Sequence, residues 1–318
     1  MTQHFADRLM ETVAAKGAPA VVALDPVYAR LPAVLRDRHD SAEPVDADAA
    51  IDAIWEFGWR VIKAIAPVVP VVKINSAYFE RYHARGIETY DNLVEEALGR
   101  GLLVIGDVKR GDVGHTAEMY ALAQLAEPPF VDAEMRVAPD AVTVNGYFGL
   151  DGIKPFIDVA TREGKGLFVL VRTSNPSAAA IQDAATQDGR KVHEVVAAEV
   201  ARWAADPETV GGCGYSCIGA VTATRDPADA ARLRAAMPKS ILLVPGYGAQ
   251  GGRAEDFMPY FDASGGGALI VAGRSVIFAH EAEAHQAAYG SDWERCVEQA
   301  CRDFVTDIAR SIGPLWRI

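Results

Sequence analysis

Residues 102–112 read Leu-Leu-Val-Ile-Gly-Asp-Val-Lys-Arg-Gly-Asp, and this stretch decides what fold to expect. Leu102–Val108 is rich in Val, Leu and Ile without clean alternation, which is typical of a strand buried on both faces of a parallel sheet. Side chains two residues apart on a strand point the same way, so Asp107 and Lys109 share a face, and Asp112 follows in the turn. The stretch predicts a parallel strand whose carboxyl end carries charge.

Seven more apolar runs recur along the chain, each bounded by turn signals: Pro19–Leu24, Val68–Ile74, Ala141–Val144, Gly166–Val171, Cys217–Thr222, Ile241–Val244 and Ala268–Ala272. Segments with helical periodicity alternate with these runs: Ala49–Ile65, Tyr90–Leu98, Thr116–Leu125, Val192–Ala204, Pro227–Ala236 and, at the C-terminal end, Trp293–Ile312. Residues 1–17 read as an amphipathic helix. The alternation of strand and helix predicts an α/β fold with parallel strands.

Eight parallel strands can close into a barrel or lie in an open, doubly wound sheet. No G-x-G-x-x-G follows the first run, where an open dinucleotide-binding sheet would carry it. Polar residues such as Asp25, Asn145 and Thr222 stand at the carboxyl ends of many runs, and in a barrel those ends converge on one mouth. We expect a single domain over residues 1–318, a (β/α)₈ TIM barrel with extra N- and C-terminal helices. Leu31–Asp48 and Asp206–Gly214 are expected to be surface insertions.

The amino-acid composition limits the classes of partner that the protein is expected to bind. The net charge of -12 disfavours nucleic acid and anionic membrane, although a local cluster of Lys and Arg can still bind a small anion. No stretch of 18 apolar residues occurs and the N-terminal segment lacks the apolar core of a signal peptide, so a cytoplasmic protein is expected. The four cysteines are spaced too loosely for a zinc site, and we expect free thiols and no metal.

The candidate chemistry centres on Asp107, Lys109 and Asp112, with Lys73 after the second run and Asp25 after the first. Buried charges are costly unless they pair, and alternating acidic and basic residues offer such pairing. The residues alone leave another interpretation open, a structural ion-pair network at the barrel rim. Lys73 by itself is also compatible with a solvated strand end, and Asp25 before Pro26 with a turn.

A second candidate region follows the last two runs. Pro245–Gly252 holds four glycines, which predicts a mobile loop able to close over a ligand. Gly273 and Arg274 lead into a predicted short helix, where barrels often bind phosphate. A plain loop and a helix cap remain the alternative. The polar run at residues 172–175 either faces a heterocycle edge or is a turn set by Asn175-Pro176.

Taken in order, these motifs resemble the orotidine 5′-phosphate decarboxylase family over about residues 21–277. The matching features are D-x-K-x-x-D at Asp107, Lys109 and Asp112, the upstream Ala-Leu-Asp25 and Val-Lys73, Thr173-Ser-Asn-Pro176, Pro245-Gly-x-Gly-Ala-Gln-Gly-Gly252 and Gly273-Arg274-Ser. The residues at these motifs and the length of the chain are most similar to the bacterial subgroup of the family, whose members carry larger inserts. The resemblance implies decarboxylation of orotidine 5′-phosphate (OMP) to UMP with no metal or organic cofactor.

The resemblance also implies residue roles. Asp107 would lie against the substrate carboxylate and Lys109 would protonate C6, while Asp112 would reach into the neighbouring subunit's site of an obligatory homodimer. Lys73 and Asp25 would hold the ribose hydroxyls.

The remaining implied contacts are with the base, the phosphate and the partner. Ser174 would bond the pyrimidine edge, and Gln250, Gly273 and Arg274 would hold the phosphate. Thr116 would lie near the intersubunit contact.

Two rival functions share this fold. The sugar-phosphate branch of the same superfamily binds Mg²⁺ through an acidic residue on the second strand, and here that position is Lys73, whose ammonium would repel the ion. A barrel that only binds a ligand is disfavoured by the intact Asp107, Lys109 and Asp112. The sequence assigns no role to Tyr247 or His115.

Overall fold

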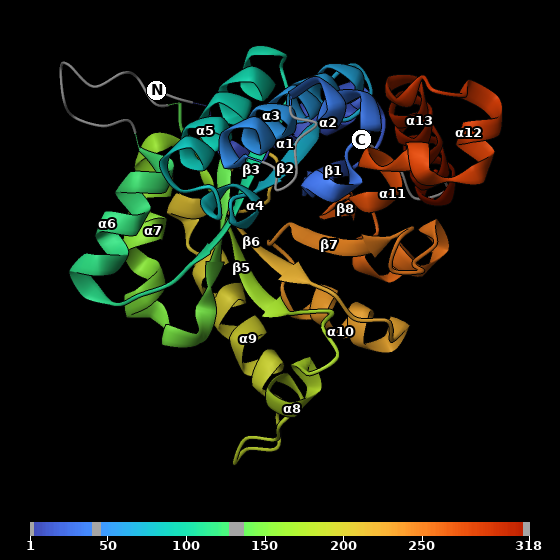
Figure 1. Cartoon of the computed structure of the whole chain (residues 1–318). Coiled ribbons are helices and arrows are strands. Elements are labelled where there is room, and N and C mark those ends of the chain that lie inside the picture. The colour runs from blue at the N-terminus through green and yellow to red at the C-terminus, as the bar shows by residue number, and fades with distance from the viewer. Residues whose placement is uncertain (1–2, 40–45, 127–136, 314–318) are drawn as a thin grey trace.

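The computed structural model describes residues 3–39, 46–126 and 137–313 of the chain. Its centre is a closed barrel of eight parallel strands in sequence order (Figure 1). The strands are β1 (Ala20–Leu24), β2 (Val71–Asn75), β3 (Leu103–Arg110), β4 (Ala141–Asn145), β5 (Gly166–Arg172), β6 (Ile218–Thr222), β7 (Leu242–Tyr247) and β8 (Ala268–Ala272). The prediction of a (β/α)₈ barrel is confirmed.

Helices surround the barrel. The longer ones are α3 (Ala47–Ile65), α5 (His83–Gly99), α6 (Gly114–Leu125), α7 (Leu150–Glu163), α9 (Val192–Ala204) and α10 (Pro227–Ala236). Short helices follow several strands: α2 (Ala33–His39), α4 (Ala77–Glu80), α8 (Ala178–Gln182), α11 (Arg274–Ile277) and α12 (Glu283–Tyr289). The predicted terminal helices are both present, as α1 (Phe5–Lys16) and α13 (Trp293–Ile312). No helix in the described ranges is long and apolar enough to cross a membrane.

Five strands (β2, β3, β4, β5 and β7) run further at their carboxyl ends than the apolar runs predicted, and three of them do so through a shift in register. The pairing register shifts between Gly106 and Arg110 of β3, between Leu170 and Arg172 of β5, and between Pro245 and Tyr247 of β7. Such bulges bend a strand and re-aim its side chains. The polar motifs of the sequence therefore belong to the irregular last residues of these strands.

The N-terminal helix closes the end of the barrel where the strands begin. Phe5 packs edge-to-face on Phe168 with ring centroids 6.2 Å apart, and only a glycine fits at residue 166, because a Cβ there would lie 2.3 Å from the Phe5 ring. Asp7 accepts hydrogen bonds from the backbone of Gly212 and Cys213, at 3.0 and 2.7 Å. The insertion at residues 206–214 thus packs on α1 ahead of β6, at the opposite end from the strand termini that carry the polar motifs.

The segment at residues 31–48 was expected to be a surface insertion, and part of it packs into the core instead. It contains α2, and Leu31 and Leu35 of this segment are buried in the core. Residues 40–45 lie outside the described residues. Two helices also differ from the pattern: α5 begins at His83, well before Tyr90, and α7 contains Pro155, which interrupts the expected helical signal.

The C-terminal helix α13 packs against α3 and α11 at the side of the barrel (Figure 1). Trp293 at its first turn stacks on Phe57 of α3, with ring centroids 5.4 Å apart, and Phe304 and Ile308 are buried. This helix also contacts β1 and the segments that follow β7 and β8.

Candidate active site

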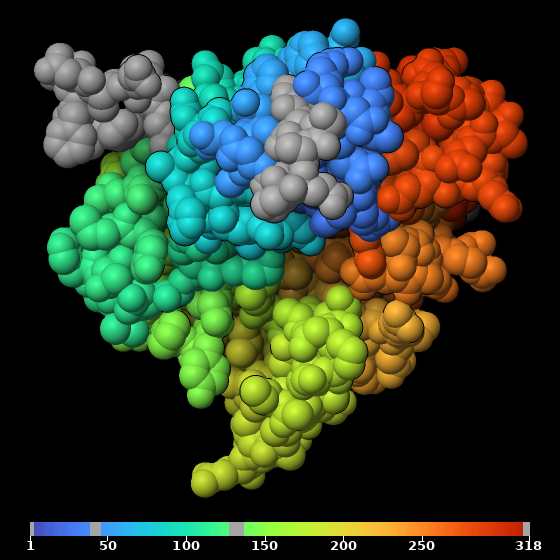
Figure 2. Space-filling view, in the orientation of Figure 1, coloured from blue at the N-terminus to red at the C-terminus, as the bar shows by residue number. Residues whose placement is uncertain are grey.

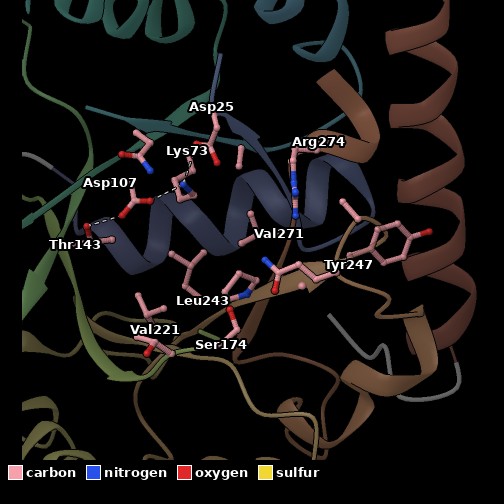
Figure 3. A pocket seen from close by; sticks show the side chains of 18 of the residues that line it. Asp25, Lys73, Asp107, Thr143, Ser174, Val221, Leu243, Tyr247, Val271 and Arg274 are labelled. Carbon is pink, nitrogen blue, oxygen red and sulfur yellow. Dashed lines mark hydrogen bonds and ion pairs between the residues drawn. The ribbon is translucent and has the colours of Figure 1, made fainter. Parts of the chain in front are cut away.

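A cavity of about 250 Å³ opens at the carboxyl ends of the strands, where the space-filling view is hollowed at its centre (Figure 2). Eight of the ten predicted site residues line it: Asp25, Lys73, Asp107, Lys109, Ser174, Gln250, Gly273 and Arg274. Figure 3 labels five of them: Asp25, Lys73, Asp107, Ser174 and Arg274. They come from six different strands or the loops that follow them. The convergence expected of a barrel mouth is confirmed for these eight residues.

The charges at the base of the cavity alternate in sign. Lys73 Nζ lies 2.6 Å from Asp107 Oδ2 and 3.6 Å from Asp25 Oδ1, and Lys109 Nζ lies 2.6 Å from Asp107 Oδ1. Lys73 and Asp107 are buried, whereas the side chain of Lys109 is 49% exposed. Of the two lysines in this network, Lys109 is the one whose side chain remains open to the cavity.

The pairing keeps these groups ionised despite burial. Burial disfavours the carboxylate of Asp107, but Lys73 and Lys109 outweigh it and lower its pKa to about 2. Burial likewise disfavours the ammonium of Lys73, yet Asp25 and Asp107 raise its pKa above the ordinary value. At neutral pH the cavity therefore presents the Asp107 carboxylate beside the buried Lys73 ammonium.

Lys109 is held in an unusual backbone conformation with φ of 46°, which a non-glycine residue adopts only when its surroundings enforce it. Its backbone N–H donates to Thr143 Oγ1 at 3.0 Å, and the same hydroxyl donates to Asp107 Oδ1 at 2.9 Å. Thr143 is fully buried on β4 and lines the cavity. The sequence pattern did not single out Thr143 and pointed to Asn145 at the end of the same strand. The Asn145 side chain instead caps the following turn by accepting the Tyr147 N–H. A threonine in the otherwise apolar run at residues 141–144 was the available signal.

The two remaining predicted residues lie outside the cavity of this chain. Asp112 Oδ1 accepts a hydrogen bond from the Val113 N–H at 2.8 Å, and Thr116 is exposed on α6. His115 is also on the surface, where it contacts Glu118. Apolar side chains around this region are exposed: Val113, Met119, Tyr120, Tyr147, Phe148 and Leu150.

The Gly-rich segment at residues 245–252 folds into a hydrogen-bonded turn. The Gly248 N–H donates to the Gly252 carbonyl at 2.9 Å and the Gly251 N–H to the Gly248 carbonyl at 2.7 Å. Gly246, Gly248 and Gly251 have positive φ values, so these glycines serve the shape of the turn. Arg225 donates to the Gln250 carbonyl at 2.9 Å and ties the turn to the loop after β6. The turn and Arg274 at the start of α11 face the same side of the cavity (Figure 3).

The loop that carries Ser174 is also tied down. Arg172 donates to Gln182 Oε1 at 2.9 Å and to Asp183 Oδ2 at 3.1 Å. Gln182 Oε1 also accepts the Thr173 N–H at 3.0 Å. Gln182 was not predicted, because its contact with residue 173 arises only when α8 folds back on the strand end.

In the described part of the chain, no group of three or more His, Cys, Asp or Glu side chains is placed to hold a metal ion. The four cysteines are unpaired, as expected, and only Cys213 is exposed.

Comparison with known proteins agrees with this geometry. The model of the orotidine 5′-phosphate decarboxylase / HUMPS family matches residues 21–289. The orotidine 5′-phosphate decarboxylase of Caldicellulosiruptor saccharolyticus is 36% identical over 98% of this chain and 99% of its own length. That of Rhodopirellula baltica is 38% identical over 93% of this chain and 96% of its own length. A crystal structure described as a candidate orotidine 5′-phosphate decarboxylase from Streptomyces avermitilis superposes with a TM-score of 0.76 at 30% identity, covering 98% of this chain and 97% of the other.

The family model also takes in sugar-phosphate enzymes, but both curated relatives carry the decarboxylase name over nearly their whole length. The chain therefore belongs to the orotidine 5′-phosphate decarboxylase family, whose members convert OMP to UMP in pyrimidine synthesis.

Proposed function

We propose that this protein decarboxylates OMP without a metal or organic cofactor, and that Lys109 protonates C6 of the product. The observation that carries the proposal is the alternating network of Asp25, Lys73, Asp107 and Lys109 in the cavity, with Arg274 and the Gly-rich turn on its far side. A phosphorylated substrate fits a cavity with these two sides. Its phosphate would bind at Arg274 and the Gly-rich turn, and its reacting carbon would lie at the charged network.

Decarboxylation of OMP requires a fixed positive charge near C6. Loss of CO₂ leaves a carbanion at that carbon with no conjugated sink, so its charge must be met electrostatically. Lys109, held 2.6 Å from Asp107 and fixed in its backbone by Thr143, is prepositioned to do this and then to donate its proton. Asp107 would face the departing carboxylate, and its lowered pKa keeps it charged there.

The other lining residues are assigned to the rest of the substrate. Asp25 and Lys73 would bind the ribose hydroxyls, and Ser174 the pyrimidine edge. Gln250, the Gly273 backbone and Arg274 would bind the phosphate; an arginine fork and a helix start suit such an anion. The phosphate is remote from C6, but its binding energy can still act on the chemical step.

Asp112 and Thr116 are proposed to complete the site of a second copy in a homodimer. Both lie outside the cavity of their own chain, next to the exposed apolar side chains around α6 and η2 (Gly146–Phe148). Exposed apolar side chains gathered in one region of a protein favour an interaction site there. The protein is proposed to act in the cytoplasm on a small-molecule substrate, with neither nucleic acid nor membrane as a partner.

The decisive test follows the absorbance of OMP with purified protein in EDTA. We expect rapid conversion to UMP, with no change when Mg²⁺ is added, because Lys73 occupies the place an acidic metal ligand would need. Turnover that requires Mg²⁺ and uses a sugar phosphate instead of OMP would move the protein to the sugar-phosphate branch. Binding of UMP with no turnover of OMP would leave only a binding protein.

Thr143 offers a prediction about positioning. Thr143→Val keeps the shape of the side chain but removes the hydroxyl that joins the Lys109 N–H to Asp107. A hydrogen bond to a charged group is worth about 1.5–3 kcal/mol, so we expect kcat to fall about 10- to 100-fold. Thr143→Ser is the matched control and should restore most of the activity. An unchanged kcat for Thr143→Val, measured with the same absorbance assay, would rule out this role.

A further inference from the structure

We propose that Tyr247 and Asp307 form a tether by which the C-terminal helix α13 holds the phosphate-binding turn in its binding-competent shape. The Tyr247 hydroxyl donates to Asp307 Oδ2 at 2.8 Å. In Figure 3 the Tyr247 ring points away from the cavity and toward α13, although its residue lines the cavity wall. The inference rests on the proposed function, because it assigns the turn to the phosphate of the substrate.

The ring of Tyr247 is fixed on more than one side. It packs on Phe304 of α13 with ring centroids 4.6 Å apart, and on Phe257 of η4 (Ala254–Tyr260) at 6.4 Å. Burial, followed by the hydrogen bond to Asp307, raises the pKa of Tyr247 above its ordinary value, so the hydroxyl stays protonated and able to donate. Tyr247 is therefore a fixed point within the turn.

The residues next to Tyr247 explain why a fixed point matters. Gly246 and Gly248 flank it with φ of 132° and 69°, and glycines lose more conformational freedom on ordering than other residues. If the Gly-rich turn were free, it would lose this conformational entropy each time it bound a ligand, and the affinity would be lower. Anchoring Tyr247 on one side and the Gln250 carbonyl on Arg225 on the other orders the turn in advance.

The tether joins two parts of the chain that are far apart in sequence. The turn spans residues 245–252, whereas α13 spans Trp293–Ile312. The tether thus gives α13 a part in the site in addition to its packing on α3. Tyr247 and Asp307 are positioning residues on this account, since neither is assigned to the reacting atoms.

The experiment compares ligands that differ only in the phosphate. Tyr247→Phe removes the hydroxyl and keeps the ring, and Asp307→Ala removes its acceptor. Each should lower kcat/KM for OMP and weaken UMP binding by about tenfold, the size of one hydrogen bond to a charged group. Turnover of orotidine and binding of uridine, which lack the phosphate, should stay at wild-type values. The double variant should lose no more than either single one, because both changes break the same contact.

Glu298→Ala is the matched control, since it removes a carboxylate of α13 that lies more than two turns before Asp307 and pairs with Arg295 and Arg302. It should leave the ratio of UMP to uridine affinity unchanged. Equal losses for phosphorylated and unphosphorylated ligands, additive losses in the double variant, or a loss of thermal stability with no change in this ratio would each overturn the inference. Calorimetric binding of UMP and uridine needs no turnover, so it tests the tether even if OMP is not the substrate. A wild-type protein that binds UMP no better than uridine would also overturn it.

Discussion

Replacing Lys109 by alanine is expected to lower kcat for OMP by about 10⁴-fold or more, because on the proposed mechanism one side chain supplies both the electrostatic stabilisation of the carbanion and the proton. The structure offers no substitute in the described part of the cavity. Lys73 is buried and committed to Asp25 and Asp107, with its ammonium 2.6 Å from Asp107 Oδ2. Arg274 stands on the other side of the cavity and cannot serve as an acid near neutral pH.

The measurement is the decrease in OMP absorbance in EDTA, with calorimetric UMP binding as a check on the folded site. Lys154→Ala is a suitable control, because Lys154 is an exposed lysine of α7 that pairs with Asp158 on the same helix. It should keep wild-type activity. A Lys109→Ala protein that binds UMP and still turns over OMP within about tenfold of wild type would contradict the assignment of the proton donor.

Mixed dimers are expected to recover activity that neither parent has. Asp112→Ala alone should lower kcat by about 10³-fold if its carboxylate acts in the neighbouring site. In a heterodimer of Asp112→Ala with Lys109→Ala, one site carries both changes and the other carries neither. Two differently tagged chains purified together should therefore show about half the wild-type activity, since one of two equivalent sites is intact.

The control heterodimer pairs Lys109→Ala with Asp107→Ala. Asp107 and Lys109 contact each other within one chain, so each site of that heterodimer carries one damaging change and should stay inactive. No recovery with Asp112→Ala would show that Asp112 acts within its own chain or not at all. Failure to capture any heterodimer would argue against the proposed dimer.

The barrel was predictable because its signal is local and repeated. Each strand is a short apolar run, and β8 has the predicted bounds while most others differ by one or two residues. The carboxyl ends of β3, β5 and β7 were harder, since polar residues continue these strands past the apolar run through a bulge. Pairing with neighbouring strands decides such endings, and hydrophobic pattern alone does not contain it. The start of α5 and the whole of α7 were missed for the related reason that tertiary packing outweighs weak helical signals.

The site was predictable where chemistry and spacing coincide. Asp107 and Lys109 could be placed together because two residues on one strand share a face, and the barrel mouth gathers the other strand ends. Thr143, Gln182 and Asp307 could not be found in this way. Their roles depend on hydrogen bonds between elements far apart in the chain, and each residue is unremarkable in its own segment.

The sequence by itself determined the barrel, the identity of the charged residues and their order along the strands. These features depend on the alternation of apolar runs and polar strand ends, which involves residues close together in the sequence. Only the tertiary structure decided which charges touch, how Thr143 fixes the strained backbone of Lys109, and that Asp112 lies outside the cavity of its own chain. It also decided that the Gly-rich turn is anchored to α13 through Tyr247. The physical reason is that hydrogen bonds and ion pairs act over a few ångströms in space, between residues whose separation along the chain carries no information about that distance.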